Sequence, residues 1–210
     1  MMTEELVLYT NPLSRGRIAR WMLEEVGVPY RTEILGFGTT MKADGYKAVN
    51  PMGKVPTIVH GNNVVTECAA ICAYLADAFP EAGLAPPHAE RANYYRWLFF
   101  AAGPVEASVS NRALGFEVPK DRERMIGYGT YADVINTLEK AVEANPYIAG
   151  DRFTAADVYV GAQLGWGMQF GTIEKRPAFE RYFGQLASRE AAIRANEKDN
   201  AAAAELQSAG

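Results

Sequence analysis

The sequence predicts a chain in two parts, a small α/β domain with a mixed sheet followed by an all-helical domain. Three observations lead to this prediction. Strand patterns alternate with helical patterns only in the first 80 residues, residues 80–87 carry three prolines and a glycine, and only helical periodicity follows them. We therefore expect domains over residues 1–80 and 88–210, joined by a linker over residues 81–87. The full 210 residues are enough for two small domains with their own cores.

The first elements predict a parallel βαβ unit. The apolar run over residues 6–10 is typical of a short strand, and residues 29–34 have the pattern of a second one. Between them lies a helical segment that ends at Gly27, a residue common just past a helix C-terminus. Its apolar residues recur every four positions on one face: Ile18, Met22 and Val26. Two strands joined through a helix are expected to run parallel.

The rest of the first domain predicts a loop, a hairpin and a helix. Residues 36–50 are rich in glycine and polar residues, which favours a loop with at most a short helix. Residues 57–60 and 64–66 flank Gly61-Asn62-Asn63 and are typical of a β-hairpin. The pattern over residues 67–79 is helical again.

The second domain shows helical periodicity throughout. Gly103-Pro104 is expected to bend or break the first of its helices, whose residues Ala92, Tyr95, Phe99 and Ala102 share a face. Thr154 and Asp157 predict a capping box at the start of a later helix. The tail after Arg189 is interpreted either as a last helix or as disordered. The expected helices cover residues 89–113, 120–144, 154–170 and 177–188.

Composition narrows the possible partners. A net charge of −4 gives no general attraction to nucleic acid, and no apolar stretch reaches the length of a membrane span. The acidic N-terminus lacks the pattern of a signal peptide, so we expect a cytoplasmic protein without nucleic-acid or membrane partners. Cys68 and Cys72 do not form a CxxC pair, and His60 and His88 lack metal-ligand spacing. We therefore expect no metal site.

The stretch NPMGKVP, residues 50–56, places a proline at the mouth of a predicted strand. Proline has no backbone N–H to give to a sheet. If the Val55–Pro56 bond is cis, the chain turns sharply there and leaves the N–H and C=O of Val55 facing outward. The sequence thus predicts a short length of backbone with which an extended peptide can pair.

A second feature lies where a predicted strand becomes a helix, at Thr66-Glu67-Cys68. A helix N-terminus presents free N–H groups and the positive end of the helix dipole, which suits a carboxylate. Glu67 beside it can bind an ammonium group. The two features together predict a ligand with an extended peptide part and an amino-acid-like end.

Three segments in this order resemble the cytosolic glutathione transferases, with the serine-type bacterial members as the nearest pattern. They are LYTNPLSRGRIARWMLEEVGVPY, NPMGKVPTIVHGNNVVTECAAICAYLADAFP and GDRFTAADV. The resemblance covers nearly the whole chain. It implies a thioredoxin-like first domain, a helical second domain and a homodimer, with glutathione as co-substrate and no separate cofactor.

The resemblance also implies a place for glutathione. Val55, next to a cis Pro56, would pair its backbone with the cysteinyl part, while Glu67 and Cys68 would hold the γ-glutamyl end. Family members usually carry serine at the position of Cys68. A thiol is the poorer donor, so the contact is expected to rest on the backbone N–H. Lys42 and Lys54 would approach the glycyl carboxylate.

Four residues are candidates to activate the glutathione thiol, which must ionise to react. A hydroxyl or amide donor just after the first strand would favour the thiolate. Ser14 is the first candidate by its resemblance to serine-type transferases, although it also suits a plain helix cap. Arg15 and Arg17 offer positive charge or are solvated helix residues. The alternatives to Ser14 are Asn11, Tyr9 and Thr10.

The expected activity is conjugation of glutathione to hydrophobic electrophiles, as in detoxification. The electrophile site is expected between the domains, with aromatic walls from Tyr94, Phe100, Trp166 and Phe170. Four alternatives stay open: a glutathione-dependent isomerase, peroxidase or disulfide reductase, or a non-catalytic ligand-binding protein. The absence of cysteine from residues 10–14 argues against a disulfide mechanism that uses the protein's own sulfur.

Overall fold

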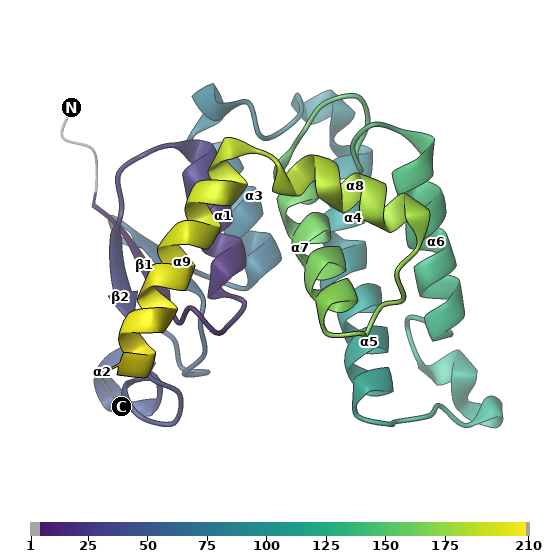
Figure 1. Ribbon diagram of the computed structural model, residues 1–210, viewed down its shortest axis with the longest axis horizontal. Coiled ribbons are helices and arrows are strands. Elements are labelled where there is room, and N and C mark those ends of the chain that lie inside the picture. The colour runs from purple at the N-terminus through teal and green to yellow at the C-terminus, as the bar shows by residue number, and fades with distance from the viewer. Residues whose placement is uncertain (1–4, 209–210) are drawn as a thin grey trace. The chain divides into compact units, whose positions relative to one another are not determined.

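The computed structural model describes residues 5–208 and divides into two compact units (Figure 1). One unit comprises Met1–Gly83 and Ser188–Gly210, and the other comprises Leu84–Ala187. Residues 1–4 and 209–210, which hold most of the acidic N-terminus and the end of the tail, lie outside the described residues. Within residues 5–208 no helix is both long and apolar enough to span a membrane.

The first unit is built on a four-stranded mixed sheet. Its strands are β1 (Leu6–Thr10), β2 (Arg31–Ile34), β3 (Thr57–His60) and β4 (Asn63–Thr66), in the spatial order β2-β1-β3-β4. β1 is parallel to β2, which confirms the βαβ unit, and β3 is antiparallel to β4, which confirms the hairpin. β3 also runs antiparallel to β1. With its helices this sheet has the predicted thioredoxin-like arrangement.

Two longer helices from the first 80 residues belong to this unit, α1 (Gly16–Val26) and α3 (Cys68–Ala78), and they contact each other. The predicted loop contains a 3-10 turn, η1 (Thr40–Lys42), and a short helix, α2 (Asp44–Lys47). The fully buried side chains of the unit come from both the sheet and these helices. They include Leu8, Ile18, Met22, Ile58, Ile71 and Cys72.

The tail forms a helix, α9 (Glu190–Ser208), that runs along α1 (Figure 1). Three small residues, Ala191, Ala192 and Ala195, are buried on its inner face. The sequence boundaries placed residues 88–210 in one helical domain, whereas these contacts join α9 to the unit that holds the sheet. The apolar signal of α9 is weak because alanines make most of its buried face.

The second unit is helical. Its α-helices are α4 (Arg91–Phe100), α5 (Glu106–Ala113), α6 (Tyr131–Ala144), α7 (Ala155–Gln169) and α8 (Pro177–Ala187). The predicted bend at Gly103-Pro104 is a π-helical segment, η4 (Ala101–Val105), between α4 and α5. The face of Ala92, Tyr95, Phe99 and Ala102 is exposed, while Tyr94, Trp97 and Leu98 enter the core.

The long helix predicted over residues 120–144 was wrong at its start. A 3-10 segment, η5 (Lys120–Met125), is followed by a turn, and α6 begins only at Tyr131 with Thr130 as its cap. Gly129 has a φ of 70° in that turn, a conformation that interrupts a helix.

The predicted capping box at the start of α7 is confirmed. Thr154 Oγ1 accepts a hydrogen bond from the Ala156 N–H at 3.3 Å, and Asp157 Oδ2 accepts one from the Thr154 N–H at 2.8 Å. Asp157 Oδ1 also accepts from the Ile148 N–H and from the Tyr182 hydroxyl, each at 2.7 Å. Burial raises the pKa of the Asp157 carboxyl, although these donors act in the opposite direction. The role of Asp157 is structural.

Candidate functional site

The register of the sheet brings the predicted site segments to one end of the first unit. Tyr9 pairs with Thr57, and Thr57 pairs in turn with Thr66. These three residues lie near the C-terminal end of β1, at the start of β3 and at the end of β4. Three segments therefore lie at this same end of the sheet, here called the site edge: the β1–α1 connection, the Val55–Pro56 bond and the start of α3.

Val55 stands at this edge with its backbone unused. The Val55–Pro56 bond is cis, as expected. Within residues 5–208 neither the N–H nor the C=O of Val55 has a protein hydrogen-bond partner. Val55 is half-buried, so both groups belong to a partly enclosed edge.

Glu67 occupies the N-cap position of α3 in an unusual backbone conformation. Its φ of 65° and ψ of 121° make it the one non-glycine residue with positive φ in the described part of the chain. Its side chain makes no capping hydrogen bond to the helix, and the residue is exposed. The first N–H groups of α3 lack intrahelical acceptors by geometry, so they remain directed outward beside a free carboxylate.

Cys68 begins α3 and connects it to the start of α1. Its thiol donates to the carbonyl oxygen of Arg15 with a sulfur–oxygen distance of 3.8 Å. Because this is the thiol's only hydrogen, an anion at the start of α3 is left to the backbone N–H groups. The neighbouring Cys72 is fully buried, and burial raises the pKa of its thiol well above the ordinary value.

The turn before Val55 is held by two residues that the sequence analysis missed, Tyr46 and Asn50. The Tyr46 hydroxyl and the Asn50 side-chain amide both donate to the Lys54 carbonyl oxygen. Both side chains also contact Thr57 Oγ1, at 2.8 and 3.1 Å. The signal for Asn50 was its place before Pro51, since Asn-Pro is a common turn pair. Its Oδ1 accepts from the Met52 N–H.

Lys42 and Lys54 flank this turn and are both exposed. The Lys42 ammonium donates to the Met52 carbonyl oxygen at 3.0 Å. Lys54 directly precedes Val55 in the chain. This placement suits the carboxylate at the far end of an extended peptide.

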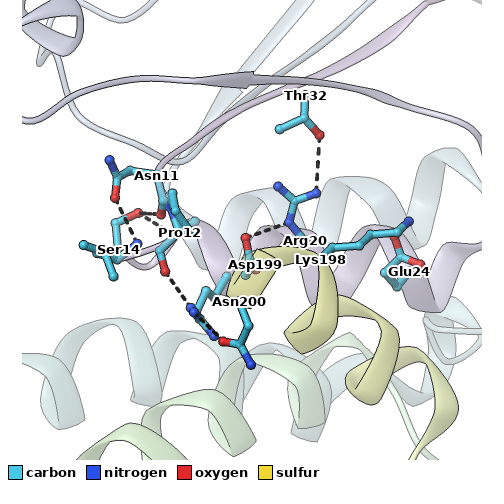
Figure 2. A network of polar contacts seen from close by, with 12 residues as sticks. Asn11, Pro12, Ser14, Arg20, Glu24, Thr32, Lys198, Asp199 and Asn200 are labelled. Atoms are coloured by element: carbon cyan, nitrogen blue, oxygen red, sulfur yellow. Dashed lines mark hydrogen bonds and ion pairs between the residues drawn. The ribbon is translucent and has the colours of Figure 1, made fainter. Parts of the chain in front are cut away.

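Ser14 and Asn11 lie in the β1–α1 connection, where the Asn11 carbonyl oxygen accepts hydrogen bonds from both the hydroxyl and the backbone N–H of Ser14 (Figure 2). The Ser14 hydroxyl donates to the Asn11 carbonyl oxygen at 2.7 Å and accepts from the Gly16 N–H at 3.0 Å. Ser14 therefore shapes the turn into α1. To donate to a bound thiolate, its hydrogen must leave the Asn11 carbonyl.

The Asn11 side chain ties β1 to the residue after β2. Its Nδ2 donates to the Leu35 carbonyl oxygen at 2.7 Å, and its Oδ1 accepts from the Leu13 N–H at 2.9 Å. Only 3% of Asn11 is exposed. One amide hydrogen stays available, but most of the side chain is occupied in holding the segment.

The other residues considered as activators of the glutathione thiol differ in their exposure to solvent. Thr10 is fully buried, and its hydroxyl has no hydrogen-bond partner within residues 5–208. Tyr9 is partly accessible, with its ring 5.4 Å from the ring of Tyr46. Arg15 is exposed, and the Arg17 guanidinium is turned back onto the segment itself, where its Nε donates to the Pro12 carbonyl oxygen.

The aromatic residues assigned to the electrophile site all belong to the helical unit. Tyr94 is only 1% exposed and lies in its core, whereas Phe170 is 70% exposed. Phe100 and Trp166 are intermediate, and the Trp166 and Phe170 rings meet edge to face at 6.5 Å. Their assignment stays a prediction. Within residues 5–208 there is no cluster of three metal-ligating side chains.

Known protein families match both parts of the chain. The model of the glutathione S-transferase N-terminal domain matches residues 15–78, and the model of the C-terminal domain of the same enzymes matches residues 93–190. These two segments include α1 through α3 and most of the helical unit.

Individual relatives agree with these matches. Glutathione S-transferase 3 of Zea mays is 31% identical over 170 residues, covering 72% of this chain and 73% of the relative. A glutathione transferase structure from Methylococcus capsulatus has a TM-score of 0.77 at 28% identity, covering 93% of this chain and 98% of that one. Another, from Phanerochaete chrysosporium and in complex with oxidized glutathione, has a TM-score of 0.76 at 25% identity, covering 95% and 98%. The chain belongs to the glutathione S-transferase family.

Proposed function

We propose that this transferase binds glutathione along the edge formed by Val55, Glu67 and the β1–α1 connection, and conjugates its sulfur to a hydrophobic electrophile. The observation that carries the proposal is the unpartnered backbone of Val55 at that edge. A backbone N–H and C=O that lack partners form an antiparallel pair with an extended peptide. The structure from Phanerochaete chrysosporium, which holds oxidized glutathione, supports the ligand class.

The charged groups around Val55 match the two ends of this tripeptide. The N–H groups at the start of α3 receive the γ-glutamyl carboxylate, and the Glu67 carboxylate receives its ammonium. Lys42 and Lys54 stand on the other side of Val55 in the chain and receive the glycyl carboxylate. The order of positive and negative groups fixes the direction of the peptide, and its central cysteinyl part then lies at Val55.

In this arrangement Ser14 stabilises the thiolate. A free thiol has a pKa of about 8.5, so a donor must favour the charged form for the sulfur to react near neutral pH. Once a thiolate is bound, its negative charge makes it a stronger acceptor than the Asn11 carbonyl that now takes the Ser14 hydrogen. The positive end of α1 acts in the same direction.

Most of the rate enhancement is assigned to holding thiolate and electrophile together. Apolar and aromatic surface of the helical unit, with Phe170, Trp166 and Phe100 as the accessible assigned residues, sets which electrophile is accepted. Tyr94 is buried in the core of that unit and can only support this surface from behind. Conjugation of hydrophobic electrophiles is a detoxification chemistry.

The first prediction concerns Ser14. Ser14→Ala lowers turnover by about 10-fold, as loss of one donor to a developing or stabilised anion does, and leaves glutathione affinity within about twofold. Turnover is measured with a panel of halides, epoxides, enones and hydroperoxides, and affinity by calorimetry.

Asn11→Ala and Tyr9→Phe are measured beside Ser14→Ala. An unchanged rate in Ser14→Ala, with a large loss in one of the other two variants, moves the role to that residue. Passage of the wild-type protein through glutathione resin without retention contradicts the proposed function. Retention without turnover over the whole panel leaves a ligand-binding role in its place, and turnover with hydroperoxides alone indicates a peroxidase.

We further propose a cytoplasmic homodimer. The exposed face of α4 supports the dimer, because Tyr95 and Phe99 are 42% and 72% exposed on it, and large apolar side chains gathered on one face are typical of an interface. Light scattering after size-exclusion chromatography tests this, with Phe99→Glu expected to give the monomer.

A further inference from the structure

Helix α9 is bound to α1 by a row of ion pairs along their contact (Figure 2). Arg20 Nε donates to Asp199 Oδ1 at 2.8 Å, and both side chains are at most 5% exposed. The Glu24 carboxylate accepts from Lys198 and Arg194 on α9, and Glu25 accepts from Arg189, which directly precedes that helix. Burial raises the pKa of Glu24, but the hydrogen bonds from Lys198, Tyr30 and Arg194 together with the Lys198 charge hold that pKa below its ordinary value.

One member of this contact reaches beyond α1. The Arg17 guanidinium donates from one nitrogen, Nη2, to Asn200 Oδ1 at 2.9 Å on α9. From another nitrogen, Nε, it donates to the Pro12 carbonyl oxygen at 2.6 Å. Arg17 is therefore a bridge between the C-terminal helix and the connection that carries Asn11 and Ser14.

The position of Pro12 makes this bridge relevant to the proposed chemistry. Pro12 lies directly after Asn11 and two residues before Ser14 in the same tight turn. The hydrogen bond from the Ser14 hydroxyl to the Asn11 carbonyl oxygen closes this turn. A guanidinium is planar and rigid, so two hydrogen bonds at different nitrogens fix its orientation. Without Asn200 the Arg17 side chain has one anchor fewer, and the Pro12 carbonyl is held less tightly.

We propose that Asn200 and Arg17 are positioning residues, which hold the Pro12 carbonyl and so place Ser14 and Asn11 for the bound sulfur. The inference rests on the proposed function for its kinetic part only. It differs from a direct electrostatic effect of Arg17 on the thiolate, because removal of the Asn200 amide leaves the Arg17 charge in place.

The test compares Asn200→Ala with Asn196→Ala. Asn196 is also an exposed asparagine, one turn earlier on α9, and its side chain makes no hydrogen bond within residues 5–208. We expect Asn200→Ala to lower kcat about threefold, with the KM for glutathione unchanged. The pH at which the rate rises is expected to be about half a unit higher in Asn200→Ala. One pKa unit corresponds to about a tenfold change in ionisation, so about half a unit corresponds to about threefold. Asn196→Ala behaves as the wild type.

A conservative variant separates positioning from stability. Asn200→Asp keeps an oxygen for Arg17 and is expected to restore kcat and the pH profile. Both alanine variants are expected to unfold at the same temperature. Restoration without a difference in unfolding temperature supports a positional role, and a kcat loss that follows the unfolding temperature instead overturns it.

A second readout does not depend on activity. Amide hydrogen exchange over residues 13–17, which include the turn bonds from Ser14 N–H to Asn11 and from Arg17 N–H to Ser14, is expected to quicken about threefold or more in Asn200→Ala and not in Asn196→Ala. Equal exchange in the two variants overturns the inference, whatever the kinetics. If instead the exchange changes as expected but wild-type protein neither binds nor conjugates glutathione, the proposed function fails and the bridge stands as a structural contact.

Discussion

At the scale of single residues, Glu67 shows how the site departs from local rules. A side chain at φ 65° and ψ 121° has an unfavourable backbone conformation that costs about 1–3 kcal/mol. No local side-chain hydrogen bond explains its presence, since the Glu67 side chain makes no cap to α3. Under the proposed function, the strain sets the carboxylate beside the first N–H groups of the helix.

This interpretation gives a prediction for Glu67. Glu67→Gly and Glu67→Ala both weaken glutathione binding about 10-fold, as loss of one charged contact does. They differ in stability, because glycine adopts positive φ without the Cβ penalty that alanine retains. We expect the free energy of unfolding of the Glu67→Gly variant to be about 1 kcal/mol higher than that of the Glu67→Ala variant.

Urea denaturation of the two variants and the wild type, with binding measured by calorimetry, checks the Glu67 prediction. Equal stability of the glycine and alanine variants would show that the backbone is not strained in solution. Unchanged affinity in both would remove Glu67 from the site.

Ser14, the first candidate to donate to the thiolate, also has a structural role. The sequence suggested either a thiolate donor or a plain cap. The structure shows the hydroxyl inside the turn, bonded to Asn11 and Gly16. Its hydrogen bonds are those of a turn residue, and the donor role requires the hydrogen to move to the ligand.

At the scale of elements, α7 depends on glycines for close packing. It is buried along nearly its whole length, so neighbours approach it from several directions. A Cβ at Gly165 would lie 2.4 Å from the Phe183 ring on α8, and one at Gly167 would lie 2.5 Å from Ile173. Glycine normally weakens a helix relative to alanine, and here it allows the contact between α7 and α8.

Two opposite changes test this packing. Gly165→Ala is expected to destabilise the chain by about 1–3 kcal/mol, the usual cost of overpacking a core. Gly184→Ala on the exposed side of α8, where a Cβ meets nothing within 4 Å, is expected to stabilise it by up to about 1 kcal/mol. The unfolding temperatures of the two variants check both signs. Stabilisation by Gly165→Ala would mean that Phe183 moves aside freely.

At the scale of the whole molecule, the unit that holds the site is assembled from both ends of the chain. Its sheet and first helices come from the first 83 residues, and α9 returns more than 100 residues later to cover α1. The ion pair between Arg20 on α1 and Asp199 on α9 is buried in the contact between these two helices. Removing one partner of a buried pair is strongly destabilising, because the other charge stays buried.

Truncation tests this dependence. A chain that ends at Arg189 loses α9 and leaves Arg20 without its carboxylate, which we expect to lower Tm by roughly 10 °C, from a loss of about 3–5 kcal/mol. A chain that ends at Ala204 keeps every buried residue of α9 and is expected to melt within about 2 °C of the full chain. Equal melting of both truncated chains would show that α9 contributes nothing to the unit.

The order and type of most elements, the hairpin, the parallel βαβ unit and the capping box could be predicted from the sequence, as could the segments proposed to form the site. These features follow from local periodicity, turn chemistry and short motifs, which nearby residues specify. The sequence analysis missed Tyr46 and Asn50, extended the helix before α6 and left α9 undecided. Tyr46 and Asn50 lie only eight and four residues before Lys54, and the start of α6 is set by the turn at Gly129 and the cap at Thr130, so these points are local. The place of α9 and the Arg17 bridge to Asn200 needed the folded chain, because they join residues far apart in the sequence. A hydrogen bond between such residues depends on the register of the sheet and the packing of α1 on α9, and no local pattern encodes either.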